Sequence, residues 1–143
     1  MKKSQKYIIL SCVILIAVII AGGIIYKNIN KPEKGVCVEQ GRIVNGSAPF
    51  TSEEVYSAMA ALKFLFEDKY IGCRMTDMWY SETGGVNYKT ETESRITLYS
   101  NVTTGSYSVG KMQKNMSYKG WRWVFQKNTN TGEWEYLSDG YGV

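Results

Sequence analysis

The strongest pattern of hydrophobic positions in the chain is an apolar run of twenty residues, Tyr7 to Tyr26, which contains no charged side chain and has lysines on both sides. A helix of this length would extend about 30 Å, the thickness of the hydrocarbon core of a bilayer. The run therefore predicts a single transmembrane helix over residues 7–26. A cleaved signal peptide is the alternative, with Ala21-Gly22-Gly23 as the small-residue site. The anchor is favoured because apolar sequence resumes at once with Ile24.

The polar sequence on either side of this run predicts how the chain is divided. Residues 1–6 form a short tail, residues 27–34 are polar and contain Pro32, which is typical of a linker, and residues 35–143 are enough for one small domain. Lysines flank the run on both sides, so the positive-inside bias is weak. By analogy with signal-anchors, we expect the tail in the cytoplasm and the C-terminal domain outside it, at the cell membrane.

The next pattern is helical. Thr51 and Glu54 have the spacing of a capping box, and Phe50, just before the cap, can pack against Val55. Gly72 is expected to stop the helix. Apolar residues recur along one stripe at helical spacing: Val55, Ala58, Met59, Leu62, Leu65, Phe66 and Tyr70. The sequence thus predicts an amphipathic helix of about five turns that must cover an apolar surface.

After the helix, apolar and polar residues alternate in several short segments, which predicts β-strands. We expect strands at 73–80, around 96–100, around 121–126 and from Trp134 to Asp139-Gly140, with a hairpin loop at 128–132 and a long loop at 107–119. One amphipathic helix followed by alternating strands predicts an α+β domain, in which the helix packs on a curved antiparallel sheet.

The distribution of charged residues along the chain excludes one class of partner. The chain has 17 basic and 13 acidic residues, and three of the basic ones precede the apolar run, where no acidic residue occurs. The rest of the chain therefore has 14 basic and 13 acidic residues and is close to neutral. Nucleic-acid binding requires a basic face that neutralises phosphates, and no basic cluster of that kind follows the run. No nucleic-acid partner is predicted.

Cysteine positions agree with an extracytoplasmic domain. Cys12 lies within the apolar run, and Cys37 and Cys73 are the two cysteines that follow it. In an oxidising compartment these two could pair and close a loop that stabilises the fold by about 4 kcal/mol. The alternative is two independent buried thiols, because sequence does not show how close the Cα atoms come.

The absence of histidine narrows the range of chemistry. It excludes Ser-His-Asp and Cys-His nucleophiles, histidine-ligated zinc and the commonest general base near neutral pH. The acidic residues fit no calcium-loop spacing. We therefore predict no cofactor and no metal, and we expect a protein that is not an enzyme.

Several aromatic and glycine markers carry a family resemblance. They are the Thr51-Ser52-Glu53-Glu54 helix start, Gly72-Cys73 followed by Trp79-Tyr80, Gly120-Trp121-x-Trp123, Gly132-x-Trp134 and the closing Asp139-Gly140-Tyr141-Gly142. Over residues 50–143 the chain resembles an uncharacterised extracytoplasmic domain of anchored proteins and lipoproteins in Gram-positive bacteria. That family is similar to the cone-shaped α+β superfold of ketosteroid isomerase and nuclear transport factors. The resemblance implies a fold of this kind and no catalytic role for any residue.

The cone superfold also hosts enzymes that use a pocket Asp as base and a Tyr as oxyanion donor. The residues that could take these roles here are Asp77 with Tyr80, or Asp77 with Tyr70. The alternative, which we favour, is that Asp77 lies on the exposed face of a strand whose other face holds Trp79.

These observations support three functional hypotheses. The first is a membrane-anchored, extracytoplasmic binding or interaction domain whose partner is an envelope protein or a small ligand. The second is a structural subunit of an envelope secretion or conjugation complex, an analogy of architecture. The third is a pocket enzyme related to ketosteroid isomerase.

Overall fold

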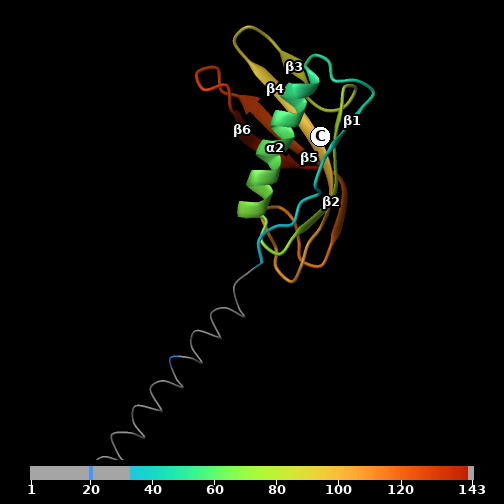
Figure 1. Ribbon diagram of the computed structural model, residues 1–143. Coiled ribbons are helices and arrows are strands. Elements are labelled where there is room, and N and C mark those ends of the chain that lie inside the picture. Colours follow the sequence, from blue (N-terminus) through green and yellow to red (C-terminus); the bar gives the residue numbers. More distant parts are fainter. Residues whose placement is uncertain (1–19, 21–32, 142–143) are drawn as a thin grey trace, which may run out of the picture. The chain divides into compact units, whose positions relative to one another are not determined.

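The computed structural model describes residue 20 and residues 33–141, and Glu33 begins a compact unit that extends to the C-terminus (Figure 1). The predicted tail, nearly all of the predicted anchor and most of the linker lie outside the described residues. Among the residues that are described, no helix is both long and apolar enough to cross a membrane.

The predicted helix is confirmed as α2, Ser52–Lys69, with both halves of its capping box formed. The amide of Glu54 donates to Thr51 Oγ1 at 3.2 Å, and the Thr51 amide donates to the Glu54 carboxylate at 3.0 Å. The apolar stripe faces inward as expected: five of its members and Tyr70 are buried, and Leu65 is half-buried. Local sequence therefore determines where this helix starts and which face it buries.

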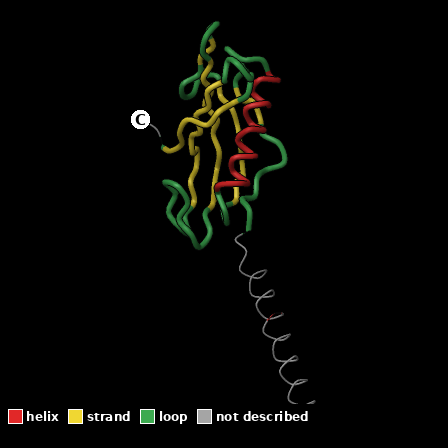
Figure 2. Tube along the Cα trace, turned by 90° about the vertical axis from the view of Figure 1, so that its left-hand side faces the viewer, coloured by secondary structure: helices red, strands yellow, loops and turns green. Residues whose placement is uncertain are grey.

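The helix packs on one face of a six-stranded sheet (Figure 2). Its strands are β1 Arg42–Val44, β2 Arg74–Ser81, β3 Tyr88–Lys89, β4 Ser94–Thr103, β5 Ser117–Lys127 and β6 Trp134–Gly140. They follow the order β1-β2-β4-β5-β6, and β3 pairs with β4.

The sheet is mixed, so the prediction of a purely antiparallel sheet is wrong. β1 runs parallel to β2, with Arg42 opposite Trp79. The physical reason is the position of the helix: α2 connects the two strands and returns the chain to the end where β1 began, as a parallel pair requires. The other named strand pairs are antiparallel.

The strands predicted from alternation correspond to β2, β4, β5 and β6, and the structure extends two of them. β4 begins at Ser94 and ends at Thr103. β5 begins at Ser117, so the last residues of the expected 107–119 loop belong to a strand. Gly120 adopts a positive φ of 66° inside β5, close to the irregular register between β4 and β5. This irregularity lets Tyr118 and Trp121 both be buried, although strict alternation would place them on opposite faces.

The core lies between α2 and the facing side of β2, β4, β5 and β6. Trp123 is its centre: the side chain is fully buried, its ring packs edge-on against Phe66, and its indole N–H donates to Ser100 Oγ at 2.7 Å. A buried Trp and a buried Ser thus satisfy each other, which allows polar atoms in an otherwise apolar layer.

Candidate functional site: a pocket beside Asp139

The structure does not bring together the three residues proposed from the sequence as a pocket. Tyr70 is the C-terminal cap of α2 and is buried. Tyr80 is buried on β2 and donates a hydrogen bond to the carbonyl of Ala48 at 2.7 Å. Asp77 lies on the outer side of β2 and forms an ion pair with Arg42 at 2.7 Å. Each of the three therefore has a separate partner.

Asp77 and Trp79 lie on the same side of β2, and the expectation that Trp79 occupies the opposite face is wrong. Met78 and Tyr80 are buried, whereas Asp77 and Trp79 are partly exposed. Residues two apart on a strand share a face, which explains the outcome. The Arg42 guanidinium lies 5.5 Å from the Trp79 ring, and Trp79 stacks on the ring of Tyr99 at 5.7 Å. This row of side chains stabilises the outer face of neighbouring strands.

Of the two alternatives left open for Cys37 and Cys73, a disulfide or two independent thiols, the structure has the free thiols. Val36 pairs with Arg74 in a parallel bridge. If this parallel register is continued by one residue in each direction, Cys37 lies beside Met75, and Cys73 lies beside Gly35. The two cysteines are therefore offset by two residues, or about 7 Å, along the strand direction. Burial, and then the negative charge of Glu67, raise the pKa of the Cys37 thiol to about 12. Burial also raises the pKa of Cys73.

Instead, the structure gathers polar groups around Asp139, near the end of β6. The Asp139 side chain is 4% exposed, and its Oδ2 accepts two hydrogen bonds, from the Tyr70 hydroxyl at 2.6 Å and from the Trp121 indole at 3.2 Å. Lys111 Nζ lies 3.8 Å from Oδ1 and donates to the backbone carbonyl of Asp139 at 2.7 Å. The helix end, the 104–116 loop and β5 thus each contribute one group to this carboxylate of β6.

A pocket of about 540 Å³ opens beside this cluster. Its wall contains the Asp139 residue, the cations Lys111 and Arg122, and aromatic rings from Trp121 and Tyr141. The rings of Trp121 and Tyr141 pack edge to face, 5.0 Å between centroids. The pocket therefore combines aromatic surface with two cationic side chains, next to a buried and well-held carboxylate, a composition typical of ligand sites.

The phenols near Asp139 are neutral hydrogen-bond donors at physiological pH. Burial, followed by the hydrogen bond and negative charge of Asp139, raises the pKa of Tyr70 far above its ordinary value. Burial and the same carboxylate raise the pKa of Tyr136 to about 12. Both effects favour the protonated phenol, because a phenolate here would be desolvated and would repel Asp139.

Within residues 33–141, no group of three or more His, Cys, Asp or Glu side chains is arranged to hold a metal ion. Comparisons with protein-family models, with curated proteins and with solved structures find no match to this chain.

Sequence reasoning assigned Asp139 only to the end of a strand. Its donors Tyr70 and Trp121 lie 69 and 18 residues away, and no local spacing connects them. The one signal that marks the place is the closing Asp139-Gly140-Tyr141 segment, where the aromatic strand that begins at Trp134 ends.

Proposed function

We propose that the protein is a membrane-anchored binding domain, located outside the cytoplasm, that takes a small ligand in the pocket beside Asp139. The observation that carries the proposal is the pocket wall beside the buried Asp139 cluster, where Lys111, Trp121 and Tyr141 lie together. Lys111 and Trp121 are held in place by hydrogen bonds to Asp139, so they cost little to organise when a ligand arrives, which favours affinity. The apolar run at 7–26 and the family resemblance support the anchored, extracytoplasmic location.

The pocket chemistry favours a ligand with a flat ring and an anionic group. Lys111 is 66% exposed at its side chain and lies on the pocket wall, so its Nζ can donate to a ligand as well as to Asp139. Trp121 and Tyr141 offer aromatic surface for stacking. A carboxylated sugar or a benzoate-like acid combines both features.

Binding is favoured over catalysis by what surrounds the carboxylate. A general base needs a free oxygen within reach of its substrate. Asp139 Oδ2 already accepts from two donors, and Lys111 lies beside Oδ1. The pocket-enzyme alternative relied on Asp77 with Tyr70 or Tyr80, and these residues have separate partners. We therefore propose a non-enzymatic role.

The ligand hypothesis is tested with pairs of related compounds. The full-length protein in detergent is titrated with glucuronate and glucose, and with benzoate and benzyl alcohol, while tryptophan fluorescence and amide NMR shifts are recorded. We expect the two acids to shift signals of the Asp139 pocket and the neutral partners to bind more weakly. Lys111→Gln should remove this preference, and Lys114→Gln, in the same loop but not in the pocket wall, should retain it. Equal response to all four compounds, or none, would refute an anionic-ligand site.

The location is tested separately by protease treatment of intact cells that express the full chain with a cytoplasmic-side N-terminal tag. We expect loss of the 33–143 domain and survival of the tag. A domain that is protected until the cells are lysed would overturn the proposed orientation.

A further inference from the structure

The last strand of the sheet has one free edge. β6 is the terminal strand of the order β1-β2-β4-β5-β6, so β5 pairs with one of its sides only. Near the end of this edge, Lys111 donates a hydrogen bond to the backbone carbonyl of Asp139 at 2.7 Å. An exposed edge of this kind is a template for another strand.

An apolar groove of about 490 Å³ lies between this strand and α2. Phe64 and Leu65 of the helix line one side, and Trp134 and Tyr136 of β6 line the other. Phe64 is 77% exposed, an unusual position for a large apolar side chain on a helix that buries its opposite face. Figure 1 shows β6 and α2 as neighbours along this side of the molecule.

One residue of the groove wall has a buried donor without an acceptor. Trp134 is 8% exposed, and its indole Nε1 is buried with no hydrogen-bond partner among the described residues. Buried N–H groups are nearly always paired, and this one belongs to a residue that lines the groove.

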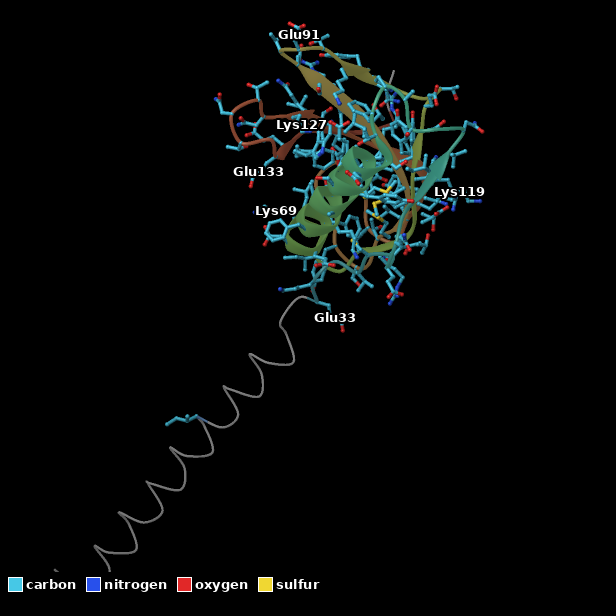
Figure 3. The ribbon with its side chains drawn as sticks, turned by 45° about the horizontal axis from the view of Figure 1, so that its top comes forward. Glu33, Lys69, Glu91, Lys119, Lys127 and Glu133 are labelled. Atoms are coloured by element: carbon cyan, nitrogen blue, oxygen red, sulfur yellow. The ribbon has the colours of Figure 1, made fainter. Side chains whose placement is uncertain are left out.

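Charge at the groove indicates which kind of chain fits. Asp68 and Glu133 lie on its rim, and Glu135 projects from β6 into solvent. The cation at the rim, Lys69, is paired with Asp68 at 2.9 Å. Figure 3 shows Lys69 and Glu133 on the same side of the helix. The rim is therefore net acidic, which favours basic partners and opposes a second copy that would bring the same acids to the contact.

We propose that an extended peptide segment of a partner protein docks in this α2–β6 groove and pairs with the free edge of β6 as an added strand. Alternate apolar side chains of the segment enter the groove between Phe64 and Tyr136, and the Lys or Arg side chains between them lie on the other face of the added strand, toward Glu133 and Glu135. This is recognition by strand addition, in which the backbone supplies affinity and alternate pockets supply specificity. The groove is separate from the ligand pocket proposed above and does not depend on it.

The test uses three synthetic peptides and the full-length protein in detergent. The probe is an acetylated, amidated heptapeptide of alternating Lys and Val. The first control replaces every Lys with Glu, and the second keeps the Lys-Val sequence but carries N-methyl groups on alternate amides. We expect the probe to bind and to slow amide hydrogen exchange in β6, because added hydrogen bonds protect an edge strand. Both controls should bind at least about tenfold more weakly.

Two pairs of protein variants locate the contact. Phe64→Asp should lower affinity for the probe about tenfold, whereas Tyr56→Asp should change it less than about twofold, because Tyr56 is an exposed aromatic residue of the same helix that does not line the groove. Glu133→Lys should lower the affinity for the probe and make that affinity less dependent on salt concentration. Glu91→Lys, in the turn between β3 and β4, should change neither the affinity nor its salt dependence.

Three results would overturn the proposal. One is the absence of binding at peptide concentrations up to about 1 mM, which is weaker than a functional docking site requires. Another is equal binding of the N-methylated peptide, because strand addition needs those amides. The third is a concentration-dependent dimer that protects β6 without peptide, since the occupant would then be a second copy of the chain.

Discussion

Tyr70 donates a 2.6 Å hydrogen bond to the carboxylate of Asp139, across 69 residues of sequence. Tyr70 is the C-cap residue of α2, and Asp139 is the penultimate residue of β6. The bond therefore connects the C-terminal end of α2 to the last strand of the sheet. It also fixes one oxygen of the Asp139 carboxylate, which is buried next to the proposed ligand pocket.

Tyr70→Phe should destabilise the domain. The change removes one donor from a buried carboxylate and leaves the stacking of the ring on Phe66 in place. Loss of a hydrogen bond to a buried charged group costs about 1 to 3 kcal/mol. Urea unfolding of the full chain followed by tryptophan fluorescence measures the loss. Tyr56→Phe, at an exposed tyrosine of the same helix, should change stability by less than about 0.5 kcal/mol, and equal effects of the two variants would contradict the role of the bond.

The elements that could be predicted from the sequence are those whose signals are local. Thr51 and Glu54 define the helix start within four residues, and both hydrogen bonds of the box form. The alternation around Ile96 and Leu98 identifies the inner face of β4, and both side chains are fully buried. In each case the pattern reflects a requirement that a short segment meets by itself, a capped helix end or one buried face of a strand. The sequence alone is therefore sufficient to predict these elements.

The elements that could not be predicted depend on distant contacts. β1 has three residues, too few to show a period, and it is held by pairing with β2 beyond the helix. The Asp139 cluster takes its donors from α2 and β5, so no spacing along the chain reveals it. The same limit applied to the cysteines: the parallel register at Val36, which offsets the two thiols, follows from tertiary packing.

The stability of the domain should fall in acid through Glu54. Burial alone would raise the pKa of Glu54, but hydrogen bonds from Lys89, the helix cap and Lys127 lower it to about 2. The pKa of this carboxylate is lower in the folded state than its ordinary value of 4.5. Its ionised form therefore stabilises the fold at pH values above 4.5, and this contribution is lost as the pH falls toward 2. Glu54→Gln should therefore cost about 1 kcal/mol at pH 7, the upper range for exposed ion pairs, and nothing near pH 2.

Glutamine is the informative replacement because it retains a side chain that can complete the capping box. Stability is measured by urea unfolding at a series of pH values from 7 to 2. Glu91→Gln serves as the matched control, since Glu91 is an exposed acid outside the helix. If the difference between Glu54→Gln and the wild type stayed constant across this range, the lowered pKa would be refuted.

Cys37 and Cys73 should both be alkylated when the protein is unfolded without reductant. Both are free thiols, and the native protein should react slowly with iodoacetamide at pH 8 because burial raises the pKa of each and leaves little thiolate. Mass spectrometry of the tryptic peptides measures the modification. A linked pair of peptides that appears only in the unreduced sample would show that the cysteines are bridged.

Gly85→Ala should destabilise the domain more than Gly132→Ala. Both glycines have positive φ, 68° and 74°, so alanine is strained at each by about 1 to 2 kcal/mol. The two sites differ in space: a Cβ at Gly85 would lie 2.6 Å from the side chain of buried Thr97, whereas a Cβ at Gly132 meets nothing within 4 Å. The crowding at Gly85 should add about 1 to 3 kcal/mol, because Thr97 is held by hydrogen bonds to Val86 and cannot retreat freely. Urea unfolding of the two variants measures the difference. Equal destabilisation would mean that backbone strain accounts for both and that the 84–86 loop does not pack on the outer face of β4 as closely as the structure shows.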